Sequence, residues 1–203
     1  MRFLLLTALS FFVVATAHAA PSPAETISHF QETLLNNMKQ GNALGCNGRI
    51  GNLKKNIPST FDLPFLAQHI VRKHWAAQAA PQQQDFTFAL EEMIVITYAS
   101  QFAHFNGEKF VLQNTEDLGG ERKVVHSQLV LPKNDPVNFD YVLRQTNGDW
   151  RIINVIANGV SDLAIRSAQY DRVIKDKGFG GLLIQLKGQN TKMKASCLQA
   201  AHS

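Results

Sequence analysis

The clearest structural signal of the chain lies in residues 137–157, which read VNFDYVLRQTNGDWRIINVIA. In the first half of this stretch every second residue is apolar, which is the period of a β-strand with one buried face; these residues are Val137, Phe139, Tyr141 and Leu143. The second half, residues 150–157, is again rich in β-branched side chains. Between the halves, Asn147-Gly148 tolerates the positive φ angles of a tight turn. The stretch therefore predicts an antiparallel hairpin.

Two further β-rich segments precede this hairpin, at residues 109–114 and 122–131. The rest of the chain shows apolar residues at helical spacing together with helix-capping residues. The predicted helices cover residues 22–41, 47–57, 63–77 and 81–104, and helical spacing returns after Ser161 in two segments separated by Gly178. Helices thus occupy residues 22–105, strands residues 108–157, and C-terminal helices residues 161–198.

This order of elements predicts an α+β fold. We expect a curved antiparallel sheet of about four strands packed against several helices, in the NTF2-like shape of a half-open cone with a helical subdomain. The helix at 81–104 carries a stripe of large apolar side chains that needs a large partner; the stripe consists of Phe86, Leu90, Ile94, Tyr98, Phe102 and Phe105. Such a stripe usually belongs to the core, but a helix that faces a concave sheet can also leave a dry cavity at the open end.

The N-terminus predicts export from the cytoplasm. Arg2 is followed by an apolar run to Val14 and by small residues at Ala17 and Ala19, which is the pattern of a signal peptide spanning residues 1–19. The remaining residues, 20–203, have the size of one domain. The net charge of +4 is spread along the chain without a basic tail, so nucleic acid is not an expected partner.

The chain contains two cysteines, Cys46 and Cys197. In an oxidising compartment an even number of cysteines permits one disulfide, which here would join the N-terminal helices to the C-terminal tail. Two unpaired thiols are the alternative, because the sequence does not measure the distance between them.

No catalytic or metal-binding motif stands out. Gly159–Leu163 lacks the closing glycine of a nucleophile elbow, so Ser161 is predicted to cap a helix. The histidines do not have the spacing of metal ligands, and we expect no metal and no cofactor. A small hydrolase or isomerase is an alternative that requires titratable side chains converging in the cavity, with His104, His126 and Asp140 as candidates.

Residues 150–161, WRIINVIANGVS, together with Arg166, Tyr170 and Gly178-Phe179, resemble the MlaC family, also called the toluene-tolerance auxiliary family. The likeness extends upstream to Phe61, to QQQDF at residues 82–86, to Tyr98 and to the FNG sequence at residues 105–107. The family usually has Tyr-Asp where this chain has Ile153-Asn154. The run from Ser161 to Tyr170 is most similar to the HpnM branch, which is associated with hopanoid-producing bacteria.

This resemblance implies a periplasmic shuttle that holds an acyl or hopanoid lipid in an apolar cavity and passes it between membrane transport complexes, and it implies no enzymatic activity. The implied partners are a phospholipid or hopanoid-type lipid, an inner-membrane transporter of the RND or ABC type, and outer-membrane components. A competing interpretation is a non-enzymatic periplasmic adaptor of a membrane transporter that encloses no lipid. A carrier needs an internal cavity, whereas an adaptor needs an exposed apolar patch.

The predicted cavity lining combines apolar residues from the helices and from the first strand of the hairpin: Phe65, Leu66, Ile94, Tyr98, Phe102, Phe139, Tyr141 and Leu143. Arg166 is predicted either to meet a lipid headgroup or to support its own helix through an ion pair.

Overall fold

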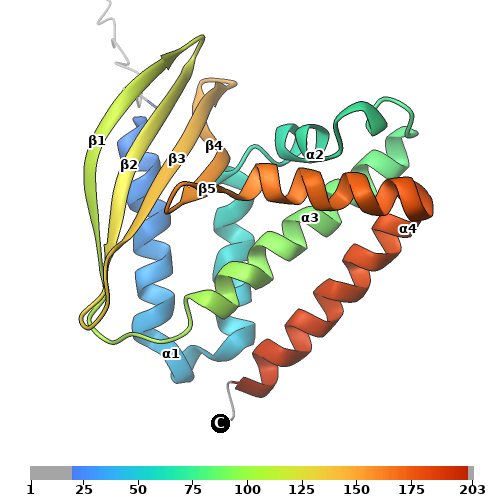
Figure 1. Ribbon diagram of the computed structural model, residues 1–203. Coiled ribbons are helices and arrows are strands. Elements are labelled where there is room, and N and C mark those ends of the chain that lie inside the picture. Colours follow the sequence, from blue (N-terminus) through green and yellow to red (C-terminus); the bar gives the residue numbers. More distant parts are fainter. Residues whose placement is uncertain (1–19, 201–203) are drawn as a thin grey trace, which may run out of the picture.

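The computed structural model describes residues 20–200, so the predicted signal peptide of residues 1–19 lies outside the described part of the chain. The fold is α+β, as predicted, with a sheet on one side and helices on the other (Figure 1). The elements, in chain order, are α1 (Pro23–Thr60), α2 (Leu63–Val71), the 3₁₀ turn η1 (Arg72–His74), α3 (Ala80–Gln101), β1 (Lys109–Gly119), β2 (Arg122–Val130), β3 (Val137–Thr146), β4 (Asp149–Ala157), β5 (Val160–Ser161) and α4 (Asp162–Ala200). Within residues 20–200, no helix is long and apolar enough to cross a membrane.

The sheet is antiparallel, with its strands in the order β1-β2-β3-β4-β5. The predicted hairpin is confirmed, because Thr146 pairs with Asp149 and the intervening Asn147 and Gly148 have φ angles of 54° and 89°. Two details of the sheet differ from the prediction. Strand β1 continues to Gly119 instead of ending at residue 114, and the two-residue β5 adds a fifth strand beside β4.

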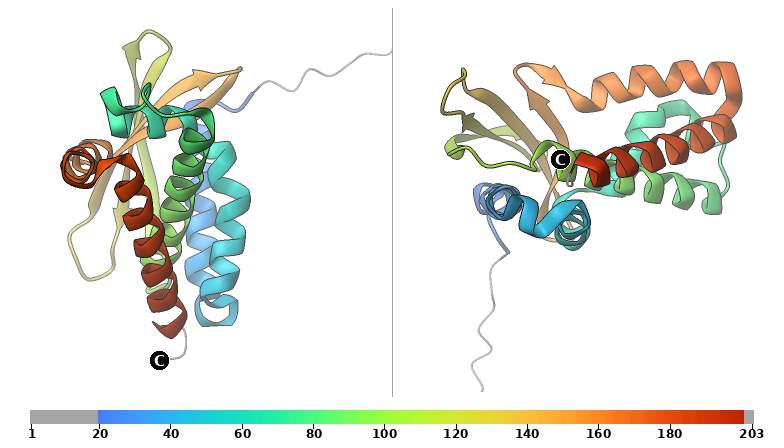
Figure 2. Two further views of the ribbon diagram at one scale, coloured as in Figure 1. Left: turned by 90° about the vertical axis from the view of Figure 1, so that its right-hand side faces the viewer. Right: turned by 90° about the horizontal axis from the view of Figure 1, so that it is seen from below.

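Helix α1 consists of two limbs that lie side by side (Figures 1 and 2). Its start has the predicted capping box, in which Ser22 accepts a hydrogen bond from the N–H of Glu25 and the Glu25 carboxylate accepts one from the N–H of Ser22. The helix leaves helical geometry at Gly41 and Gly45, where φ is 38° and 61°, and this break joins the limbs. The second limb passes its predicted end at residue 57, includes Pro58 and stops at Thr60.

Helices α2 and α3 end earlier than predicted, whereas the cap and the break of α4 lie where the sequence indicated them. Helix α2 ends at Val71 and gives way to η1, and α3 ends at Gln101 instead of about residue 104. Helix α4 begins after Ser161, whose hydroxyl accepts a hydrogen bond of 3.2 Å from the N–H of Ala164, so the predicted cap is confirmed. Gly178, with φ of 72°, breaks α4 into two limbs that run in different directions (Figure 1).

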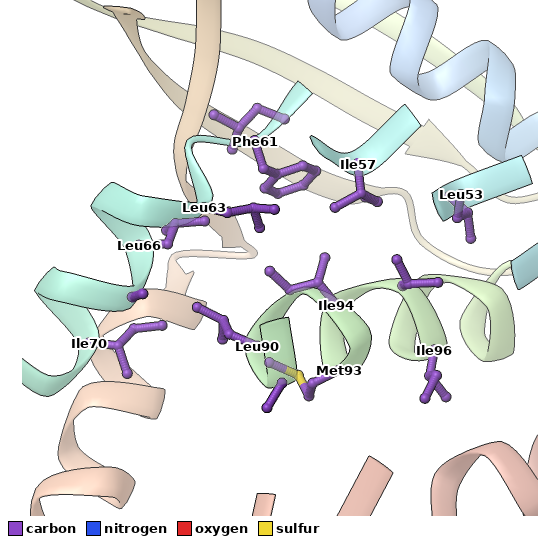
Figure 3. Packing of buried hydrophobic residues seen from close by; sticks show 14 of the residues in the cluster. Leu53, Ile57, Phe61, Leu63, Leu66, Ile70, Leu90, Met93, Ile94 and Ile96 are labelled. Atoms are coloured by element: carbon purple, nitrogen blue, oxygen red, sulfur yellow. The ribbon is translucent and has the colours of Figure 1, made fainter. Parts of the chain in front are cut away.

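The core lies between the inner face of the sheet, α1 and α3. Phe30 of α1 packs edge-on against Tyr141 of β3, and Figure 3 shows Ile94 of α3 pointing toward Ile57 of α1. The second limb of α4 packs on the far side of α3, where Phe179 meets Phe86. Phe105, which was predicted to belong to the apolar stripe of this helix, lies beyond the end of α3 and is 40% exposed, and Phe88 of α3 is 57% exposed. One side of α3 therefore faces the sheet and α1, and another faces α4.

Candidate functional site

A cavity of about 280 Å³ lies where α2, α3, β3, β4 and the start of α4 meet. This volume is close to the lower limit of roughly 300 Å³ for small-molecule sites in proteins. Most of the wall is apolar, and the lining comprises Phe61, Leu66, Ile70, Leu90, Ile94, Thr97, Tyr98, Gln101, Phe102, Phe139, Ile152, Asn154, Val155, Ala157, Val160, Asp162, Leu163, Ile165 and Arg166.

The cavity opens to solvent beside β5 and the first turn of α4. There Val160 and Ile165 line the cavity and are 54% and 44% exposed, although both are aliphatic. At the opposite end, Leu90 is fully buried and Ile94 is 8% exposed. The cavity thus runs from an apolar interior to an aliphatic rim, which suits an amphiphilic molecule whose apolar part enters first.

The polar part of the wall contains an ion pair within α4. Arg166 Nε donates a hydrogen bond of 2.7 Å to Asp162 Oδ2, one helical turn away. Burial lowers the pKa of Arg166, but the hydrogen bond and the charge of Asp162 raise it overall. Burial raises the pKa of Tyr170, and the nearby Arg166 guanidinium partly lowers it. This network holds a guanidinium group at the wall of an otherwise apolar cavity.

Tyr98 of α3 brings a hydroxyl group into the same wall. The ring packs edge-on against Phe30, with centroids 5.1 Å apart, and stacks on Phe102 at 5.8 Å. Burial holds the pKa of Tyr98 well above its ordinary value, the nearby Asp162 carboxylate raises it further, and Arg166 lowers it. The hydroxyl therefore stays protonated and can donate a hydrogen bond.

The comparison with known protein families adds a second line of evidence. Residues 28–188 match the family model described as "MlaC protein", which covers most of the chain from α1 into the second limb of α4. This chain belongs to the MlaC family. The matched region includes every residue that lines the cavity.

A solved structure has the same fold as this chain. It is the phospholipid-binding protein from Ralstonia solanacearum in complex with a phospholipid, which superposes with a TM-score of 0.73 at 19% sequence identity. The match covers 83% of this chain and 96% of that protein. At this identity the likeness shows a shared fold, and the fold predicted from the sequence is therefore confirmed for this MlaC-family chain.

The structure brings six of the nine predicted site residues of this MlaC-family chain to the cavity. They are Leu66, Ile94, Tyr98, Phe102, Phe139 and Arg166. Phe65, Tyr141 and Leu143 lie outside its lining. Tyr141 and Leu143 share the inner face of β3 with Phe139, but both are packed in the core and are 1% and 0% exposed, with Phe30 of α1 edge-on against Tyr141. Phe65 instead stacks on His69 and lies under the guanidinium group of Arg144.

Several lining residues were missed in the sequence because they sit at the ends of elements. Phe61 links α1 to α2, and its backbone pairs with that of Ile152 in β4. Val160 and Asp162 flank the junction of β5 and α4. The alternation of apolar residues along β4 could have indicated Ile152, but nothing local in the sequence marks the other three.

The titratable groups considered for a hydrolase or isomerase lie elsewhere. His126 Nδ1 is 2.7 Å from Asp140 Oδ1, and both residues belong to the face of the sheet opposite Tyr141. Neither they nor His104 are among the residues that line the cavity in the described part of the chain. Residues 20–200 also contain no group of three or more His, Cys, Asp or Glu side chains that could hold a metal ion.

Away from the cavity, Cys46 and Cys197 form a disulfide that ties α1 to the end of α4. Arg49, which is 3% exposed, lies beside it and donates hydrogen bonds to the carbonyl oxygens of Ala99 at 2.8 Å and Gly41 at 3.2 Å. These contacts join the break in α1 to the last turn of α3. This role of Arg49 was not predictable from the sequence, because a lone arginine on a helix normally faces solvent.

Proposed function

We propose that this MlaC-family protein binds a membrane lipid with its acyl chains in the cavity and its headgroup in solvent at the opening of the cavity. The observation that carries this proposal is the mainly apolar cavity, which ends at the exposed side chains of Val160 and Ile165. Each methylene group transferred from water into such a cavity contributes about 0.8 kcal/mol. The phospholipid bound by the Ralstonia solanacearum protein of the same fold supports a phospholipid as the ligand class.

The proposed setting is the periplasm, which the predicted signal peptide and the resemblance to periplasmic family members support. There the protein carries lipid between membrane transport complexes, an inner-membrane transporter of the RND or ABC type and outer-membrane components. The similarity of residues 161–170 to the HpnM branch makes a hopanoid the alternative ligand. The function requires no chemistry on the lipid, so we propose that the protein is not an enzyme.

Native mass spectrometry of protein purified from the periplasm without detergent tests this function. The expected result is a stoichiometric adduct, which organic extraction identifies as a phospholipid. A hopanoid in the extract would retain the carrier function and replace the ligand. Protein that is empty, and that also takes up no lipid from vesicles of phosphatidylethanolamine and phosphatidylglycerol, would overturn the carrier function in favour of an adaptor.

A further inference from the structure

The hydroxyl group of Tyr98 is a hydrogen-bond donor without an acceptor in the part of the chain that the structure describes. It forms no hydrogen bond with any residue between 20 and 200, and Tyr98 lines the cavity. The ring is held on three sides, by Phe30 at 5.1 Å, Phe61 at 6.0 Å and Phe102 at 5.8 Å between centroids. These apolar contacts restrict the orientation of the ring, and none of them provides an acceptor for its hydroxyl group.

A second tyrosine in the same core shows the usual arrangement. Tyr141 OH accepts a hydrogen bond of 3.5 Å from Gln31 Nε2, and Gln31 Nε2 also donates to Ser127 Oγ at 2.9 Å. Ser127 in turn donates to the carbonyl oxygen of Val111. Buried hydroxyl groups are generally paired in this way because an unpaired one loses its hydrogen bond to water. The half-buried Tyr98 hydroxyl has no such partner among residues 20–200, so it is free to donate a hydrogen bond to a ligand in the cavity.

The surroundings of Tyr98 show where this acceptor enters. Phe61 and Phe102 are apolar neighbours of Tyr98 in the cavity wall, and the same wall contains the charged side chains of Asp162 and Arg166. Asp162 already accepts the hydrogen bond from Arg166 and is 54% exposed. The hydroxyl thus shares the cavity wall with the Asp162–Arg166 ion pair, which is the charged part of a mainly apolar lining and the part that suits the oxygen atoms of a bound lipid.

We propose that Tyr98 is a specificity-determining residue, whose hydroxyl donates a hydrogen bond to an oxygen atom at the junction between the acyl chains and the headgroup of the bound lipid. This inference rests on the proposed lipid-binding function. The acceptor is an ester carbonyl or a phosphate oxygen, and both present the same chemistry to a hydroxyl donor. Tyr98 would thereby select lipids by this polar junction and not only by the volume of their chains.

The test compares Tyr98→Phe with Tyr141→Phe. Tyr98→Phe retains the ring and its contacts with Phe30, Phe61 and Phe102, and it removes only the hydroxyl. Tyr141→Phe is the matched control, because it removes a hydroxyl of the same core that lies outside the cavity lining. Circular dichroism and thermal unfolding establish that each variant is folded before binding is measured.

Binding is measured by competition between lipids with identical chains. One pair is a diester and a diether phosphatidylcholine, which differ in the carbonyl groups; the other is a phosphatidic acid and a diacylglycerol, which differ in the phosphate. Wild-type protein is expected to prefer the acceptor-bearing member of at least one pair by about three- to tenfold, the value of one hydrogen bond. Tyr98→Phe is expected to abolish that preference, and Tyr141→Phe to retain it.

The pair that responds to Tyr98→Phe identifies the acceptor as the carbonyl or the phosphate. The inference is overturned if wild-type protein binds both members of each pair equally, or if Tyr98→Phe retains every preference of the wild type. Both results leave the lipid-binding function intact, because all the lipids still bind. If folded wild-type protein binds none of the four lipids, the proposed function fails together with the inference.

Discussion

Asp62 Oδ2 lies 2.7 Å from Nε of Arg144, which joins the beginning of α2 to the inner strand β3. The same oxygen accepts a hydrogen bond of 2.7 Å from Thr146 Oγ1, and Asp62 Oδ1 accepts one from the N–H of Phe65. Asp62 is only 3% exposed, so these three bonds replace its contacts with water. Helix α2 contributes Leu66 and Ile70 to the cavity wall, so the bonds of Asp62 also help to position this part of the wall.

Replacing Asp62 by Ala is expected to lower the free energy of unfolding by about 2–3 kcal/mol, since it removes a helix cap and leaves Thr146 and the partly exposed Arg144 without their acceptor. Asp62→Asn retains an oxygen for the cap and is expected to cost less. Urea unfolding of both variants measures the difference. An Asp62→Ala variant within 0.5 kcal/mol of wild type, a margin typical of surface substitutions, would show that the pair contributes little.

The same contacts predict a loss of stability in acid. Burial raises the pKa of Asp62, but the hydrogen bonds from Thr146, Arg144 and the Phe65 N–H lower it overall. A carboxylate whose pKa is lower in the folded protein stabilises that state above its unfolded pKa of about 3.9, and this contribution disappears as the pH falls through the folded pKa. We expect the unfolding free energy of wild type to fall more steeply below about pH 4 than that of Asp62→Asn. Parallel curves for the two proteins would contradict this expectation.

The disulfide predicts a strong dependence of stability on redox state. Cys46 and Cys197 are separated by 151 positions, and closing a loop of this length stabilises a fold by about 4–5 kcal/mol in the chain-entropy model. The Cys46→Ser/Cys197→Ser variant should therefore melt at a lower temperature than oxidised wild type, and a reductant should lower the melting temperature of wild type alone. Thiol titration of the denatured, non-reduced protein should find no free thiol.

The hairpin of β3 and β4 shows what the sequence could and could not predict. Alternation correctly placed Phe139, Tyr141 and Leu143 on one face, because a strand has a strict period of two. Which part of that face borders a cavity depends on where α1 ends its contact with the sheet, and Phe30 makes that contact from more than a hundred residues away. Local patterns contain no information about such a distant partner.

Helix boundaries also divide into those that the sequence could predict and those that it could not. Ser22, Ser161 and Gly178 were predictable as caps and breaks because their effect is local. The end of α2 was not predictable, because Arg72 has a φ angle of 49° there. Arginine rarely adopts a positive φ angle, so its presence in the sequence does not indicate a helix end. In the cavity, the sequence indicated the long apolar helix α3, whereas the rim at Val160 exists only because β5 pairs with β4.

Filling the cavity should abolish lipid binding without unfolding the protein. Ile94 lines the cavity and is 8% exposed, whereas Ile184 of α4 is 76% exposed and lies outside the lining. Ile94→Trp adds apolar volume where we place the acyl chains, and it introduces no buried charge. Ile184→Trp adds the same volume to an exposed position, so the pair separates occupation of the cavity from a general effect of the larger side chain.

We expect Ile94→Trp to bind lipid at least tenfold more weakly than wild type, because it loses the burial of about two methylene groups or more at 0.8 kcal/mol each. Ile184→Trp should bind as wild type does. Native mass spectrometry after incubation with phospholipid vesicles measures the occupancy of both variants, and circular dichroism establishes that they are folded. If folded Ile94→Trp carried lipid with wild-type occupancy, the acyl chains would have to lie elsewhere than between α3 and the sheet.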